Sequence, residues 1–334
     1  MPGDRYRKAC AEGVASKMTR FVLRRLALML VTLLLVSLLV FILSRVLPGN
    51  IGRAILGPYA SNAQVAAINR RLGYDQPIPV QYLDWLRHFA QGQWGHSFVQ
   101  GTQVVPLVLS RLWASVQLGL VAIVIVIPVA IAAGVIIGLN EGGPLDQLVS
   151  TAGLSLLAIP EFVSGIVVLV IFGVDLHWFP VSAQAAPGAG FLDRVRHLLL
   201  PAFPLMLVLF GYLTRMARAG TTEVVESAYY RTAVLKGLPR RRVISRRVLR
   251  NALAPTITVT AIQAAGLVSG LVVIETLFNY PGIGQLLLNS AVDHDTPVLE
   301  ATTLLIGLIV MTANLAADVS YGLLDPRTRQ GAGT

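Results

Sequence analysis

Long uncharged apolar runs, separated by polar segments, extend along most of the chain. The runs are 26–43, 114–139, 147–174, 198–214, 252–274 and 301–317, and among them only 147–174 contains a charged residue, Glu161. Each run is near or above the ~18 apolar residues that a helix needs to cross a bilayer. The pattern therefore predicts six transmembrane helices and an all-α membrane protein.

Composition supports the same class. Hydrophobic residues make up 54% of the 334 residues and charged residues 13%, whereas soluble domains carry about 25% charged residues. Because the apolar residues are gathered into runs, the pattern favours a helical bundle in lipid over a soluble core.

The basic residues predict an orientation. Of 27 Lys and Arg, 18 lie before the first run, in the loop 217–251 or in the C-terminal tail, and 7 lie in the loops of the opposite side. The positive-inside rule then places both termini in the cytoplasm, although Glu141 and Asp146 in a short cytoplasmic loop run against the trend. Since these basic residues flank spans and lack aromatic stacking partners, the net charge of +10 does not indicate a nucleic-acid-binding protein.

Two long extramembrane segments carry helical signals of their own. In the outer segment 48–113, Ser61 and Gln64 form a capping-box pattern, and Pro79 and Gly92 mark the start and end of a second helix. The segment is therefore predicted to be a small folded cap. The inner segment 217–251 is predicted to be a helix, a break at Gly237 and Pro239, and another helix rich in arginine.

Motifs for catalysis are missing from the sequence. No Gly-Lys-Ser or Gly-Lys-Thr of a phosphate-binding loop, no H-E-x-x-H zinc pattern and no G-x-S-x-G elbow occurs. The single Cys10 allows no internal disulfide. The chain is therefore predicted not to be an enzyme and to hold no metal or cofactor.

Ionisable residues in or beside spans are candidates for function because they are costly in lipid. Glu161 follows Pro160 inside the third run, where its carboxylate either caps the break in the helix or lines a substrate path. Glu275, Glu300 and Asp318 lie near span ends and are interpreted as structural.

Several motifs together resemble the permeases of dipeptide and oligopeptide ABC importers. The inner loop contributes Tyr230, Arg231, Thr232, Ala233, Lys236 and Gly237, then Arg250, Asn251, Ala252, Leu253 and Pro255. Two further matches are Glu275, Thr276, Phe278, Pro281, Gly282 and Gly284, and Asn314, Asp318, Tyr321, Asp325, Pro326 and Arg327. Upstream matches are Leu47, Pro48, Gly49, Leu72, Gly73, Asp75, Gln76, Pro77, Gly95, Ser97 and Phe98, so the resemblance extends from Arg20 to Arg329.

Three departures from the family pattern concern the cap and the inner loop. Asn50 stands where the family usually has Asp, and Gln93 with Trp94 replaces an acidic residue and a leucine. The Glu-Ala-Ala of the broader importer pattern is here Arg231, Thr232 and Ala233, a departure that is common among peptide permeases.

The resemblance implies a six-helix bundle of the type I ABC importer kind, with a small periplasmic cap between the first two helices, in the bacterial inner membrane. The expected divisions are a cytoplasmic tail 1–19, a first span 20–47, the cap 48–113, a core 114–329 that includes the cytoplasmic loop 217–251, and a tail 330–334. The first span is expected to be retained, with translation starting at Met1 or Met18.

The resemblance also implies partners and a mechanism. Tyr230, Arg231, Thr232, Ala233, Lys236 and Gly237 are expected to form a coupling helix against a separate ATPase subunit, which binds the ATP and Mg²⁺. Two ATPase subunits, a sibling or identical permease, a periplasmic substrate-binding protein and membrane lipid are the expected partners. ATP-driven closure of the ATPases then switches the permeases between inward and outward openings.

Other interpretations remain open. A secondary transporter is expected to show inverted repeats with paired broken helices, and a membrane-embedded enzyme a His, Asp or Ser constellation at midplane. Related importers carry nickel chelates, glutathione, opines or sugars in place of peptides.

Overall fold

A computed structural model describes residues 3–46, 56–57, 59–71, 73, 75–186, 188–244, 249, 256, 259–260, 263, 266 and 270–324. The regular elements within these residues are helices, as the apolar runs predict. The chain divides into two compact units, residues 1–101 with 294–334 and residues 102–293.

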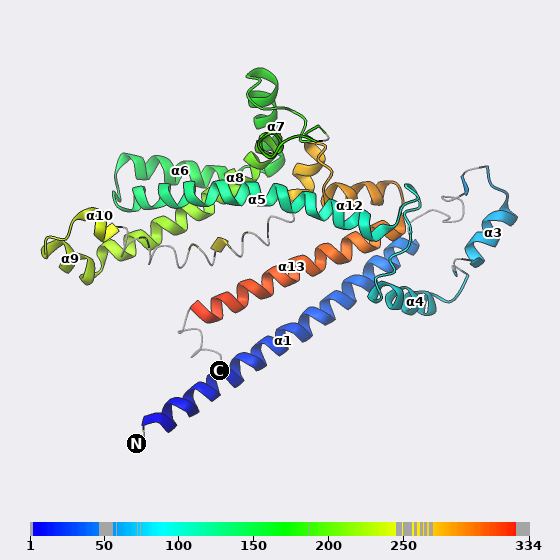
Figure 1. Ribbon diagram of the computed structural model, residues 1–334, viewed down its shortest axis with the longest axis horizontal. Coiled ribbons are helices and arrows are strands. Elements are labelled where there is room, and N and C mark those ends of the chain that lie inside the picture. Colours follow the sequence, from blue (N-terminus) through cyan, green and yellow to red (C-terminus); the bar gives the residue numbers. More distant parts are fainter. Residues whose placement is uncertain are drawn as a thin grey trace. The chain divides into compact units, whose positions relative to one another are not determined.

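The first unit contains the first and last long helices and the two helices of the outer segment. These are α1 (Gly3–Val46), α3 (Asn62–Arg71), α4 (Ile78–Ala90) and α13 (Thr296–Leu324). Helices α1 and α13 run side by side (Figure 1). The first and the last apolar run of the sequence therefore belong to the same compact unit.

Aromatic side chains attach α4 to α1. The ring of Phe41 lies 5.4 Å from that of Tyr82 and 5.6 Å from that of Trp85, between centroids. The Tyr82 hydroxyl lies 2.8 Å from Ser37 Oγ, within hydrogen-bond distance. Because Phe41 is fully buried by these contacts, the segment before the second span is folded against the first, as predicted for a cap.

Two buried acidic residues at the start of α13 hold neighbouring parts of this unit. Ser44 donates a hydrogen bond of 2.6 Å to Glu300, which Arg45 also approaches to 3.8 Å. Asp295 accepts hydrogen bonds from the Ser97 hydroxyl at 2.5 Å and from the backbone N–H of Phe98 at 3.1 Å. The predicted structural role of Glu300 is confirmed, whereas the Asp318 side chain lies outside the described residues.

The local signals of the outer segment are confirmed. Gln64 N–H donates to Ser61 Oγ at 3.3 Å while the Gln64 side chain accepts from Ser61 N–H at 3.0 Å, which is a capping box. Helix α4 begins at Ile78, with Pro79 in its first turn, and ends just before Gly92, which has a positive φ of 77°.

The second unit is built on three packed helices. Helix α5 (Val104–Gly138), α6 (Pro144–Ala158) and α8 (Phe191–Glu226) lie side by side in Figure 1. The core between α5 and α8 includes Leu118, Ala122, Leu205, Leu209 and Leu213. Shorter elements follow around them: α7 (Glu161–Val168), the π-helix η1 (Leu169–Asp175), α9 (Ala228–Leu235), α10 (Arg240–Val243), the helical segment 270–277 and α12 (Ile283–Val292).

Within the described residues, four helices are long and apolar enough to cross a membrane: Val22–Arg45, Val104–Gly138, Phe191–Glu226 and Thr296–Ala316. A fifth crossing is formed if the bent pair Pro144–Ala158 and Glu161–Asp175 counts as one span. The predicted span 252–274 lies mostly outside the described residues, so the count of six stays a prediction.

The helices are longer than the apolar runs. Helix α5 begins at Val104, inside the predicted cap 48–113, and α8 continues to Glu226, inside the predicted loop 217–251. Arg111 and Arg215 bound the uncharged runs without ending the helices, since arginine has a high helix propensity. The third run also differs from a straight span, because α6 and α7 meet at Pro160 with a bend of 107°.

Candidate functional site

The candidate coupling site begins where α8 ends. Helix α8 stops at Glu226 and α9 starts at Ala228, so one residue, Ser227, separates them. Ser227 has extended backbone angles, and its hydroxyl accepts a 3.4 Å hydrogen bond from the backbone N–H of Tyr230. Serine at this position is a favoured N-cap, so the short break is a defined turn between two helices.

Helix α9 ends with a Schellman motif. The N–H of Gly237 donates to Val234 O at 2.9 Å, and the N–H of Leu238 donates to Ala233 O at 3.3 Å. Gly237 has a φ of 70°, which disfavours side chains. The predicted break at Gly237 is therefore confirmed, and the backbone conformation there favours glycine.

The six predicted coupling residues all lie on α9 or at its end. Arg231, Thr232, Lys236 and Gly237 are exposed, and Tyr230 is half-buried. Ala233 differs, because it is only 3% exposed within this chain. The surface that α9 offers to another protein therefore excludes most of Ala233.

Leu235 is a surface feature that the sequence motifs do not single out. Its side chain is 88% exposed at the end of α9, beside the exposed Val234. Exposed apolar side chains on a short surface helix are candidate anchors for a protein partner. Helical periodicity, applied from the Ser227 cap onward, is the signal that identifies this position.

The arginine-rich part of the loop is described only in part. Helix α10 covers Arg240–Val243, with Arg242 exposed and Val243 buried. The side chains of Arg240, Arg241, Arg246, Arg247 and Arg250 lie outside the described residues, as do Asn251, Ala252, Leu253 and Pro255 of the same motif.

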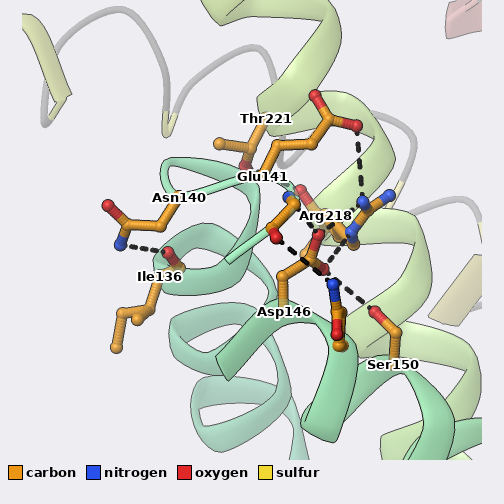
Figure 2. Close-up of polar contacts among 10 residues, drawn as sticks. Ile136, Asn140, Glu141, Asp146, Ser150, Arg218 and Thr221 are labelled. Atoms are coloured by element: carbon orange, nitrogen blue, oxygen red, sulfur yellow. Dashed lines mark hydrogen bonds and ion pairs between the residues drawn. The ribbon is translucent and has the colours of Figure 1, made fainter. Parts of the chain in front are cut away.

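A polar cluster around the buried Asp146 joins α8 to the first turn of α6 and to the turn between α5 and α6. We call Arg218, Glu141, Gly142, Asp146 and Ser150 the Arg218 cluster. Figure 2 shows the Arg218 guanidinium directed at both acidic side chains: Nε lies 2.5 Å from Asp146 Oδ1, Nη2 lies 2.7 Å from Asp146 Oδ2, and Nη2 lies 3.3 Å from Glu141 Oε1.

Asp146 is fully paired within this cluster. It also accepts hydrogen bonds from the Gly142 N–H at 2.9 Å and from the Ser150 hydroxyl at 3.1 Å, and it is 4% exposed (Figure 2). The two acidic residues that run against the positive-inside trend are thus both paired with one arginine. No sequence motif indicates this pairing, which joins positions 72 residues apart.

Glu161 lies on another element of the same unit. It is the first residue of α7, directly after Pro160, and is half-buried. Its carboxylate occupies the space beside Gly270, where an added methyl group would overlap it. Gly165 of α7 approaches the same segment, since a methyl group there would lie 2.6 Å from Leu277 Cδ2. The structure thus places Glu161 at the contact between α7 and residues 270–277, apart from the α9 residues.

The motif from Glu275 to Gly284 has a structural explanation. Glu275 is fully buried and accepts hydrogen bonds from the Ser115 hydroxyl, from Gly284 N–H at 2.7 Å and from Gln285 N–H at 3.1 Å. Ile283 N–H donates to the Ser115 hydroxyl at 2.8 Å. We call these groups the Glu275 cap, because they satisfy the first N–H groups of α12. The predicted structural role of Glu275 is confirmed.

Comparison with protein families gives two matches that together span most of the chain. Residues 130–330 match the model of the binding-protein-dependent transport system inner membrane component. Residues 18–119 match the model of the N-terminal part of the membrane component of binding-protein-dependent transport systems.

Individual relatives are similar over nearly their full length. The chain is 34% identical to the oligopeptide transport system permease protein AppB of Bacillus subtilis and 36% identical to the di/tripeptide transport system permease protein DppB of Pseudomonas aeruginosa. It is 31% identical to a probable peptide ABC transporter permease, y4tP, of Sinorhizobium fredii. Each alignment covers 92% or 93% of this chain and 99% of the relative.

Proposed function

Because the chain belongs to the family of inner-membrane components of binding-protein-dependent transport systems, we propose that it is the permease subunit of an ATP-driven peptide importer. It is a multi-pass membrane protein of the inner membrane. Its family works with a binding protein, and the permease forms the path through the membrane.

The cargo assigned here is di- and oligopeptides. The observation that carries this assignment is the similarity, over at least 92% of the chain, to permeases of oligopeptide and di/tripeptide transport systems. Similarity of that extent includes the spans that line a path as well as the loops that contact partners.

Partner subunits supply the free energy that drives transport, by hydrolysing ATP. The sequence contains no phosphate-binding loop, so two ATPase subunits bind ATP and Mg²⁺ and hydrolyse the nucleotide. They contact α9 and the residue after it through the exposed side chains of Arg231, Thr232, Leu235 and Lys236 and the half-buried Tyr230. A second permease, either a sibling or an identical chain, completes the path, and a periplasmic binding protein docks on the segment before α5.

The proposal also includes the orientation of the chain in the membrane and the path of the substrate. Both termini and α9 are cytoplasmic, in agreement with the excess of basic residues on that side. Glu161 lies on the path, since a carboxylate inside a span is costly unless it faces water or a partner. Alternating access results from rigid movement of the helices that lead into α9.

Reconstitution tests this function. The purified complex of both permeases and both ATPases is placed in proteoliposomes, with ATP enclosed on the ATPase side and the binding protein loaded with labelled peptide on the other. We expect accumulation of peptide that requires ATP, the binding protein and intact ATPase sites. Uptake driven by an ion gradient without ATP contradicts the importer, and ATP-driven uptake of glutathione or a nickel chelate without any peptide contradicts the cargo.

A further inference from the structure

The inference concerns the packing of α8 against α5 and α6 near α9. Three glycines allow the helix backbones to approach closely. A methyl group on Gly134 of α5 would lie 2.6 Å from Ala217 Cβ, and one on Gly138 would lie 2.8 Å from Thr221 Cβ. A methyl group on Gly211 of α8 would lie 2.7 Å from the carbonyl oxygen of Gly153 in α6. Small-residue contacts of this kind bring helices together in membranes.

Close glycine contacts hold two helices near each other but provide few directional bonds. The Arg218 cluster supplies these bonds at the same end of the three helices. The guanidinium binds Asp146 through two parallel hydrogen bonds of 2.5 and 2.7 Å. A paired, two-point contact fixes geometry as well as distance. It therefore sets the rotation and register of α8 relative to the first turn of α6, which contains Asp146.

Arg218 is also connected to α9 by an almost unbroken helix. It is eight residues before Glu226, where α8 ends, which is about 12 Å along an α-helix. No break occurs in α8 between these residues, and the only interruption before α9 is the capped turn at Ser227. A displacement of α9 by a partner thus reaches Arg218 through one helix.

We propose that Arg218 is the positioning residue that makes α5, α6 and α8 move together with α9 when the ATPases close. This role rests on the proposed function of the chain. Arg218 contacts neither substrate nor nucleotide. It acts through Asp146, which is buried and would be left without its cationic partner if α8 moved alone.

The test measures peptide transported per ATP hydrolysed, using complete complexes with binding protein in proteoliposomes. Arg218→Gln removes the positive charge and the pair of hydrogen bonds to Asp146. Arg218→Lys keeps the charge but cannot form both hydrogen bonds in parallel, and Asp146→Asn removes the charge of the partner. Arg242→Gln is the matched control, because Arg242 is exposed on α10. Melting temperature and ATPase content are recorded for each complex.

We expect Arg218→Gln and Asp146→Asn to keep ATPase subunits and ATP hydrolysis while the peptide-to-ATP ratio falls at least about fivefold. Arg218→Lys recovers part of the ratio, the double variant is no worse than either single one, and Arg242→Gln is normal. An unchanged ratio, or loss of transport and hydrolysis together in proportion to unfolded complex in all three variants, overturns the proposal. Failure of the wild-type complex to import peptide instead overturns the proposed function itself.

Discussion

Gly237 is the residue whose conformation limits the end of α9 most directly. The φ of 70° at this position favours glycine, and it is tolerated better by Asn or Asp than by a β-branched residue. No described atom lies within 4 Å of a methyl group placed there. The cost of substitution therefore comes from the backbone and from whatever partner lies outside the chain.

Three substitutions at Gly237 separate these two effects. Gly237→Val costs about 1–2 kcal/mol at the end of α9 and reduces retention of the ATPase subunits. Gly237→Asn keeps the backbone and is expected to be close to wild type, whereas Gly237→Asp, of the same shape, adds a negative charge at the junction and weakens retention. Co-purification of ATPases and hydrolysis stimulated by loaded binding protein are measured. Equal behaviour of Asn and Asp, both with normal stimulation, would show that no partner contacts this turn.

Glu161 and Gly270 form a pair that a double-mutant cycle can test. Because the carboxylate occupies the space beside Gly270, Gly270→Ala alone is expected to cost about 1–3 kcal/mol of stability. In a Glu161→Ala background the same change costs less, since the overlap is gone. Equal costs in both backgrounds would contradict the contact.

The charge of Glu161 is tested separately by Glu161→Gln, which keeps the shape. We expect normal melting with reduced transport of some peptides, because under the proposed function it is the charge of Glu161 that matters to the path. Transport is measured over peptides of different charge. Wild-type uptake of every peptide would leave Glu161 with a structural role alone.

Sequence could identify single residues only where the signal is local. The Ser61 capping box and the break at Gly237 follow from residue type and neighbours, and both are confirmed. The Arg218 and Asp146 pair and the Ser115 and Glu275 pair join positions 72 and 160 residues apart. Such contacts depend on the packing of helices, which no local pattern contains.

At the scale of elements, the Glu275 cap determines the start of α12. Glu275→Ala leaves the N–H groups of Gly284 and Gln285 without their acceptor and is expected to cost about 3 kcal/mol. Gly284→Ala is also destabilising, because its methyl group would lie 2.5 Å from Val272 Cα. Gly307→Ala is the control, with no atom of the described residues within 4 Å of the added group. Melting of the purified permease distinguishes them, and a stable Glu275→Ala variant would contradict the cap.

Apolar runs predict where helices exist better than where they end. The runs 114–139 and 198–214 locate α5 and α8, but both helices continue past charged residues that remain compatible with helix. Pro160 indicates a break in the third run, but no local signal gives the bend of 107° or the contact of α7 with residues 270–277. The residues at which the helices end could therefore be identified only from the structure.

For the whole molecule, the orientation follows from the distribution of basic residues and is tested by labelling. Single cysteines at the exposed positions Gln93 and Arg242 are introduced into a Cys10→Ser background. In intact spheroplasts, an impermeant maleimide is expected to label Gln93→Cys at once and Arg242→Cys only after lysis. Labelling of Arg242→Cys from outside would reverse the predicted topology.

The central claim is that α9 is the element through which a separate ATPase moves this permease. A photo-crosslinking amino acid at position 235 tests it directly, because Leu235 is 88% exposed on α9. Leu83 of α4, 63% exposed in the segment assigned to the opposite side of the membrane, carries the same probe as the control. Irradiation of the assembled importer is predicted to give an ATPase adduct at position 235 and none at position 83. An ATPase adduct from position 83, or none from position 235 in a complex that hydrolyses ATP, would contradict the account.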